Sequence, residues 1–257
     1  MKKYELTEQT INLPGTTLYR IRALVDFGNV EAGDFGGYIA SEKNLSHTGK
    51  CWVGGEAWAY GNSEVCENAV VCENAKVCGE TKICGESVVC GNAKVEGYAV
   101  IKDNAWVSGR AEVFYRSRIE GNAHVCGDAV ITGKAQITGN STIDGYVHVL
   151  EEACIENGRF IDGERISGFA KINGNTDVFY VSLYIKDNQY LTFYRNKNSG
   201  ISINAGFYEG EIENFRKVIE EKYSVEKKDA WFSVLDFAQT FFKKNTGPYI
   251  APEHVRL

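Results

Sequence analysis

The chain has 257 residues, enough to bury a sizeable core, and a formal net charge of −6. An acidic chain is not expected to bind nucleic acid non-specifically, because that requires many cations to neutralise phosphates. The sequence contains no apolar run long enough to predict a membrane span, and no apolar stretch of a signal peptide follows its first lysines. We therefore expect a cytoplasmic protein whose eight cysteines are reduced.

Residues 1–52 are expected to form an N-terminal cap. A strand is predicted over residues 17–25, and the pair Gly36-Gly37 predicts a turn. A cap is needed here because the strands that follow would otherwise expose an open edge.

From Val53 the sequence repeats every six residues, as in VCENAV, VCENAK, VCGETK, ICGESV and VCGNAK at residues 65–94. The first position is nearly always Val or Ile, the fifth is small, and the third and fourth are mostly Gly followed by Asn, Asp or Glu. Positions five and one lie two residues apart, so both point into a narrow interior. The third and fourth positions suit a corner with positive φ. Three units close one coil of eighteen residues, and stacked coils form parallel sheets.

The repeat is expected to end near residue 183, and residues 184–257 to form an α+β cap. Residues 189–207 predict a hairpin that turns at residues 197–200. Apolar residues at helical spacing predict helices over 211–223 and 229–244. The expected domains are therefore 1–52, 53–183 and 184–257.

The units resemble those of left-handed β-helix, hexapeptide-repeat proteins, and the V-x-G-N-A-x variant is similar to a subgroup carried by phages and prophages. Residues 17–53 and 190–223 resemble the first and last segments of that subgroup. The resemblance implies an all-β solenoid: a left-handed parallel β-helix of hexapeptide repeats with an N-terminal β cap and a C-terminal hairpin plus two helices. It also implies a location in the cytoplasm of a bacterial host cell. The period alone does not determine the handedness.

The outward residues can be assigned to three faces, because residues eighteen apart stack on the same face. One face is apolar, and a contiguous apolar patch usually marks an interface. We therefore expect a homo-oligomer packed through this face, with a trimer favoured. The residues expected at the interface are Trp52, Val70, Val88, Trp106, His124 and Phe160.

Five cysteines at a spacing of six raise the possibility of a metal site. All five occupy the second, outward position of their units, so they are distributed over three faces. The stacked neighbours are Cys66 with Cys84 and Cys72 with Cys90. A tetrahedral zinc site needs four convergent ligands, and the cysteines of one protomer do not supply them. We expect no metal and no cofactor; a site shared between protomers, using His124 and Cys126, is the one form left open.

The sharpest break in the repeat is VFYRSR at residues 113–118, which places Tyr115 and Arg116 where Gly-Asn normally stands. Aromatic rings with convergent cations are suited to stacking a base and binding phosphate. This corner therefore predicts a small, anionic, nucleotide-like ligand, with a surface ladder of side chains or an oligomer contact as alternatives. The residues expected to bind the ligand are Tyr98, Arg110, Tyr115, Arg116, Arg118 and Lys134.

Three functions are open. The favoured one is a non-catalytic, phage-type accessory protein that binds a small nucleotide signal or a host factor in counter-defence. Since many left-handed β-helix proteins are trimeric acyltransferases that use acyl-CoA, acyl transfer with His124 as general base is the alternative. The repeat from Val53 to Phe160 shows no inserted loop of the kind such enzymes carry. A rigid structural spacer is the third function, and capped ends argue against open polymers.

Overall fold

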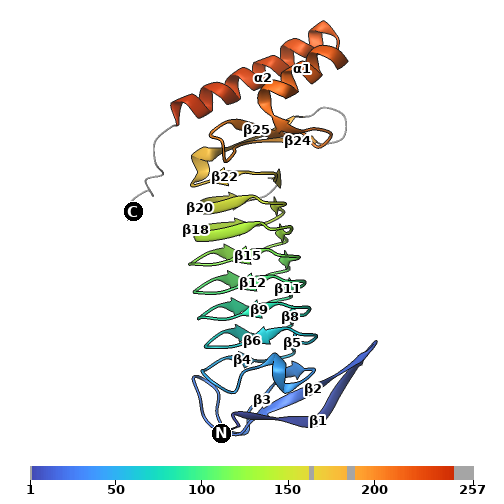
Figure 1. Cartoon of the computed structure of the whole chain (residues 1–257), viewed down its shortest axis with the longest axis vertical. Coiled ribbons are helices and arrows are strands. Elements are labelled where there is room, and N and C mark those ends of the chain that lie inside the picture. The colour runs from blue at the N-terminus through green and yellow to red at the C-terminus, as the bar shows by residue number, and fades with distance from the viewer. Residues whose placement is uncertain (1, 162–164, 184–188, 246–257) are drawn as a thin grey trace.

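The computed structural model describes residues 2–161, 165–183 and 189–245, so two parts of the expected C-terminal cap, 184–188 and 246–257, lie outside the described residues. The chain forms a parallel β-solenoid of about seven turns (Figure 1). Antiparallel strands cover its N-terminal end, and an antiparallel sheet with two helices lies at the other end. The expected solenoid with a β cap and an α+β cap is thus confirmed.

The N-terminal cap is a three-stranded antiparallel arrangement that continues one face of the solenoid. Its elements are β1 (Tyr4–Leu13), β2 (Thr16–Ala23), β3 (Phe35–Ile39) and the short helix η1 (Glu42–Asn44). The strand expected at 17–25 is confirmed as β2. The turn expected at Gly36-Gly37 is wrong, because both glycines lie within β3. A Cβ at Gly36 would lie 2.5 Å from the Val53 carbonyl oxygen, so close approach requires the glycine there.

Three faces surround the interior, and each is built from two-residue strands one coil apart. The first face consists of β4 (Trp52–Val53), β7 (Val70–Val71), β10 (Val88–Val89), β13 (Trp106–Val107) and β16 (His124–Val125). The second consists of β6 (Glu64–Val65), β9 (Lys82–Ile83), β12 (Val100–Ile101) and β15 (Arg118–Ile119). The third consists of β5 (Trp58–Ala59), β8 (Lys76–Val77), β11 (Lys94–Val95), β14 (Glu112–Val113), β17 (Val130–Ile131), β19 (His148–Val149) and β21 (Arg165–Ile166).

Two longer strands join the first and second faces near the C-terminal end of the solenoid. β18 (Gln136–Asp144) pairs with both β15 and β16, and β20 (Cys154–Ile161) pairs in parallel with β18. β22 (Lys171–Ile172) pairs with β20. The β18–β20 pair contains a register shift between Ile137 and Asn140, so the spacing of eighteen is lost beyond this point.

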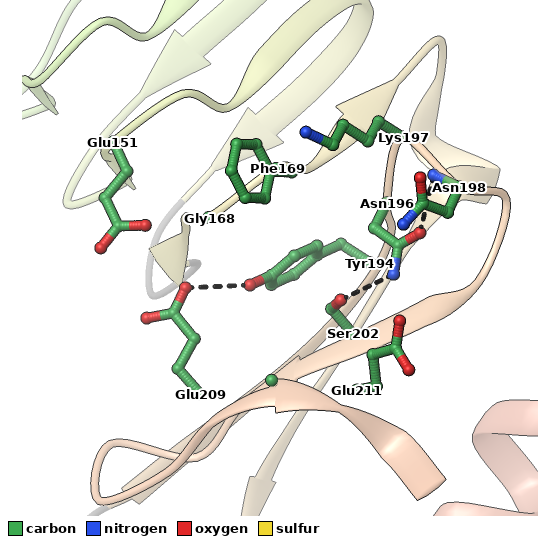
Figure 2. A pocket seen from close by; sticks show the side chains of 11 residues that line it. Glu151, Gly168, Phe169, Tyr194, Asn196, Lys197, Asn198, Ser202, Glu209 and Glu211 are labelled. Atoms are coloured by element: carbon green, nitrogen blue, oxygen red, sulfur yellow. Dashed lines mark hydrogen bonds between the residues drawn. The ribbon is translucent and has the colours of Figure 1, made fainter. Parts of the chain in front are cut away.

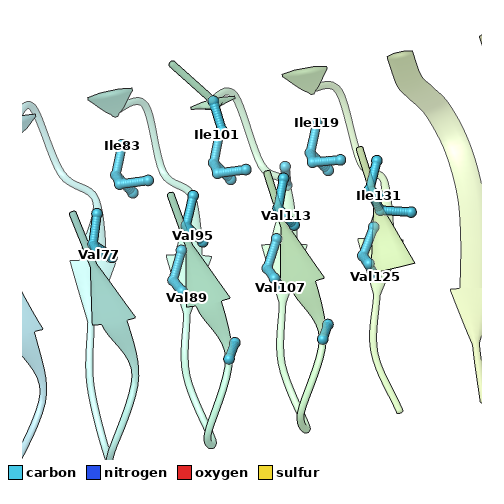
Figure 3. Packing of buried hydrophobic residues seen from close by; sticks show 14 of the residues in the cluster. Val77, Ile83, Val89, Val95, Ile101, Val107, Val113, Ile119, Val125 and Ile131 are labelled. Atoms are coloured by element: carbon cyan, nitrogen blue, oxygen red, sulfur yellow. The ribbon is translucent and has the colours of Figure 1, made fainter. Parts of the chain in front are cut away.

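The first-position residues form the core of the solenoid, as Figure 3 shows for the successive units from Val77 to Ile131. These Val and Ile side chains are fully buried, as are the small fifth-position residues between them. Burial of each such side chain contributes about 1.5–3 kcal/mol. Every third-position residue from 55 to 151 has a positive φ, which confirms the expected corners.

The C-terminal cap is a four-stranded antiparallel sheet covered by two helices (Figure 1). Its elements are η2 (Asn175–Asp177), β23 (Val178–Leu183), β24 (Gln189–Arg195), β25 (Ile201–Asn204), β26 (Glu209–Glu211), α1 (Ile212–Lys222) and α2 (Val225–Lys244). The β24–β25 hairpin and both helices are confirmed, with α2 beginning earlier than expected. Val178–Leu183, which the repeat count placed in the solenoid, instead pairs antiparallel with β24. Among the described residues, no helix combines the length and apolarity that spanning a membrane requires.

Candidate functional site

The edge between the third and second faces carries the break in the repeat, and we call it the Tyr115 edge. The fourth-position residues of this edge lie one above the other on successive coils. In order, they are Asn62, Glu80, Tyr98, Arg116, Lys134 and Glu152. The N–H of Tyr98 donates to the carbonyl of Tyr115 (2.6 Å), and the N–H of Arg116 donates to the carbonyl of Gly133 (2.8 Å). The structure therefore brings Tyr98, Tyr115, Arg116 and Lys134 together on one edge.

Tyr115 is held in a backbone conformation that favours glycine, with φ at 57°. Acidic residues at other corners have a local reason to adopt this conformation. Glu67, Glu73 and Asp103 each accept a hydrogen bond from the N–H of the glycine one coil further on, at 2.7, 2.9 and 3.0 Å. Tyr115 makes no side-chain hydrogen bond to a described residue, and its side chain is 69% exposed. Unlike these acidic residues, Tyr115 thus has no side-chain hydrogen bond to a described residue that would favour this conformation.

Among the described residues of this edge, Arg116 is the cation that remains available to a ligand. Its guanidinium carbon lies 5.7 Å from the ring centroid of Tyr98, which is 60% exposed. Arg116 makes no ion pair with any described residue. Lys134 differs, because its Nζ lies 2.8 Å from Glu152 Oε1, and this hydrogen bond lowers the pKa of Glu152. A cation that stacks on an aromatic ring and lacks a carboxylate partner is suited to binding an anion.

Arg110 and Arg118, also expected at this site, flank the Tyr115 edge and do not lie on it. Arg110 is on the edge between the first and third faces, where Nε and Nη2 donate to the two Asp128 carboxylate oxygens at 2.6 and 2.7 Å. Arg118 lies on the second face and donates from Nε to Glu120 Oε1 at 2.6 Å. Both guanidiniums are thus hydrogen-bonded to carboxylates, whereas Arg116 makes no ion pair with a described residue.

A pocket of about 420 Å³ lies where the Tyr115 edge meets the C-terminal sheet (Figure 2). Glu209 is held there by hydrogen bonds from Ser167, Tyr194 and Asn204. Lys197 Nζ lies 3.4 Å from the ring centroid of Phe169, over its face. A shallower groove of about 340 Å³, lined partly by Lys134 and Phe169, lies beside it along the edge.

Sequence reasoning missed this pocket, although one signal pointed to it. Glu151, which lines it, has φ at 58° at the third position of its unit, the same departure from glycine that singled out Tyr115. Burial, together with the nearby Glu209 and Glu151 carboxylates, raises the pKa of the Tyr194 hydroxyl. The pocket lining is rich in carboxylates, so it is less suited to a phosphate than the edge around Arg116.

The first face is apolar over its middle coils. Val70 and Val88 are half-buried, and Trp106 is 43% exposed. His124 is exposed and stacks on Trp106 with ring centroids 6.1 Å apart. Trp52 is only 8% exposed, because the N-terminal cap covers it and the Phe27 ring packs against it at 5.3 Å.

The expected position of Phe160 on the outer side of this face is wrong. Because of the register shift in the β18–β20 pair, Arg159 lies opposite Thr142, and Phe160 lies opposite Ile143. Phe160 is 2% exposed and belongs to the interior of the solenoid. It therefore does not contribute to the outer surface of the first face.

The outward cysteines lie as the repeat predicts, and burial raises the pKa of their thiols. Val65 pairs with Ile83 and Val71 with Val89, so the cysteine that follows each is stacked on its neighbour. Burial raises the pKa of Cys66 to about 12 and that of Cys72 to about 11. At neutral pH these side chains are therefore neutral thiols.

No protein-family model matches this sequence, and no curated protein is significantly similar to it. The functional assignment therefore depends on the geometry of the surface.

Proposed function

We propose that this protein is a non-catalytic binding protein and that its Tyr115 edge binds a flat anionic ligand of the nucleotide class. The single observation that carries the proposal is Arg116, which stacks on Tyr98 beside the strained, exposed Tyr115 and has no carboxylate partner among the described residues. The exposed tyrosine rings offer an aromatic face on which a nucleobase can stack, and the Arg116 guanidinium can donate hydrogen bonds to a phosphate.

The proposal extends to the class and assembly of the protein. The V-x-G-N-A-x repeat resembles that of left-handed hexapeptide-repeat proteins of phages, which favours a cytoplasmic accessory role such as sequestering a nucleotide signal in counter-defence. The apolar middle of the first face favours a homo-oligomer, in which each protomer presents its own Tyr115 edge.

Acyl transfer gains no support from the surroundings of His124. A general base needs an orienting partner and a substrate within hydrogen-bond reach. His124 stacks on Trp106 on an exposed face and forms no hydrogen bond with another described residue. The function as a structural spacer likewise gains no support, because both ends of the solenoid are covered and are not open for polymerisation.

Equilibrium binding of ADP, followed by calorimetry, tests the proposed site. Arg116→Ala is expected to weaken binding at least about tenfold, the loss of one charge-assisted contact. Arg110→Ala is the matched control, since it removes the same side chain from the neighbouring edge and should change the affinity less than about twofold. Equal affinities for the parent and Arg116→Ala would exclude this site. Native mass spectrometry of the protein purified from cells would then identify any ligand bound elsewhere.

A further inference from the structure

Two cysteines and a glutamate meet where the second face turns toward the first. Cys66 follows β6 and Cys84 follows β9, and the parallel pairing of these strands places one thiol above the other. Both cysteines are buried at 9% exposure, whereas Glu67 is exposed. The two sulfurs and a Glu67 carboxylate oxygen all lie within 4.8 Å of one another. Within the part of the chain that the structure describes, no other three His, Cys, Asp or Glu side chains bring their ligand atoms so close.

The corner geometry holds Glu67 in place. Its φ is 59°, and its Oε2 accepts a hydrogen bond from the N–H of Gly85 at 2.7 Å. Gly85 follows Cys84 directly, so this bond directs the carboxylate along the stack toward the second thiol. The exposed Glu67 side chain is thus held close to both buried thiols.

We propose that Cys66, Glu67 and Cys84 form a mononuclear site for a thiophilic divalent cation such as Zn²⁺ or Cd²⁺. Thiolates select such ions over Mg²⁺ and Ca²⁺. Three protein ligands are sufficient when water completes the tetrahedron. The spacing of the cysteines does not by itself reveal Glu67, the third ligand of the proposed site. The site is on a different edge from Tyr115 and does not depend on the proposed function.

Metal binding at this site exchanges protons for the metal ion and involves no electron transfer. Each thiol forms a metal–sulfur bond and releases its proton to solvent, so one divalent ion displaces two protons. Burial raises the pKa of both thiols, and protons therefore compete with the metal at neutral pH. Lys82, whose Nζ lies 3.6 Å from Glu64, opposes this effect by favouring the thiolates of both cysteines.

The same sequence, Val-Cys-Glu-Asn, recurs one unit later and supplies a matched control. There Glu73 Oε2 accepts from the N–H of Gly91 at 2.9 Å, so the corner is equivalent. The thiols differ, because Cys72 donates to Cys90, which also accepts a hydrogen bond from Trp106. Among the described residues, Cys72, Glu73 and Cys90 do not bring their ligand atoms within the 4.8 Å that joins Cys66, Glu67 and Cys84.

Titration of the full chain with Cd²⁺, under a phosphine reductant, tests the site through the ultraviolet charge-transfer absorbance of Cd²⁺–thiolate bonds. We expect one Cd²⁺ per chain at this site, with release of two protons. Cys66→Ser/Cys84→Ser should lose it, whereas Cys72→Ser/Cys90→Ser should bind within about twofold of the parent. Zn²⁺ in excess should compete with Cd²⁺ for the site, whereas Mg²⁺ in the same excess should not.

Glu67→Gln keeps the experiment decisive if the serine variant does not fold, because the substituted side chain is exposed. It should weaken Cd²⁺ binding at least about tenfold, since even outer-shell partners contribute that much. Glu73→Gln should leave it unchanged. No band in the parent, a band that survives Cys66→Ser/Cys84→Ser, or equal weakening by the two Gln variants would overturn the proposal.

Discussion

The guanidinium of Arg116 lies over the ring of Tyr98, one coil away on the same edge, with 5.7 Å between its carbon and the ring centroid. The residue directly before Arg116 is Tyr115, which has a positive φ and a large aromatic side chain exposed to solvent. Two rings and one cation thus lie on a rigid stack of parallel strands, and one of these rings is held in a strained backbone conformation.

Tyr115→Gly should stabilise the fold while weakening ligand binding. A side chain in the left-handed region costs about 1–2 kcal/mol, and the greater entropy that glycine loses on folding offsets part of the gain. The free energy of unfolding, from urea denaturation, should therefore rise by up to about 1 kcal/mol, and ADP affinity should fall. A variant that is less stable than the parent would show that Tyr115 makes a stabilising contact.

The control for these effects on stability and ligand binding is Glu73→Gly, at a corner where the backbone also has a positive φ. There the substitution also relieves strain but removes the hydrogen bond to Gly91, which contributes about 1 kcal/mol. Its net change in stability should therefore be smaller than that of Tyr115→Gly, and ADP affinity should stay at the parent value.

Val70→Glu/Val88→Glu should dissociate the proposed homo-oligomer. These residues are stacked at the centre of the first face, and buried carboxylates without partners would disfavour association. Sedimentation velocity should shift from an oligomer to a single chain. Val130→Glu is the control, because it places a carboxylate next to Glu112 on the third face. Unchanged sedimentation of the double variant would show that this face is not the interface.

Phe160→Ala should destabilise the protein strongly, as expected for an interior aromatic residue. Loss of a buried Phe typically costs about 3–5 kcal/mol, whereas an outward residue would cost under about 1 kcal/mol. Ile161→Ala is the neighbouring control, since Ile161 is 39% exposed and should have the small effect. Chemical denaturation of both variants gives the comparison, and similar losses for the two would contradict the register of β18 and β20.

Stability should fall at alkaline pH because the fold keeps its thiols protonated. Burial raises the pKa of Cys66 to about 12 and of Cys72 and Cys126 to about 11. Groups with a raised pKa stabilise the fold fully below their unfolded pKa of about 8.5, and that contribution is lost as the pH rises through the folded values. The free energy of unfolding should thus decline between about pH 9 and 12.

The measurement is urea denaturation across this range, with a reductant present to prevent disulfides. Buried tyrosines, whose pKa values are also raised, add to the decline. The triple variant Cys66→Ser/Cys72→Ser/Cys126→Ser should therefore decline less steeply than the parent, but not become independent of pH. Parallel curves for the two proteins would rule out a contribution from these thiols.

Local repetition was enough to predict the solenoid, its corners and the order of its faces. The interior position recurs at Val65, Val71, Val77, Ile83 and Val89, and a six-residue period leaves little freedom for a chain that must bury those side chains. The stacking of Tyr98 with Arg116 follows from the same period, because residues eighteen apart occupy equivalent positions.

Tertiary structure decided whatever depends on a change of register or on side-chain partners. The shift between β18 and β20 turned Phe160 inward, and close packing on Val53 required Gly36 within a strand. Asp128 engages Arg110, and no described carboxylate engages Arg116, which is a property of side-chain geometry. The approach of Glu67 to the thiols of Cys66 and Cys84 likewise depends on side-chain geometry. A repeat specifies the backbone, but the partner of each exposed polar side chain is determined by packing between residues that the repeat leaves variable.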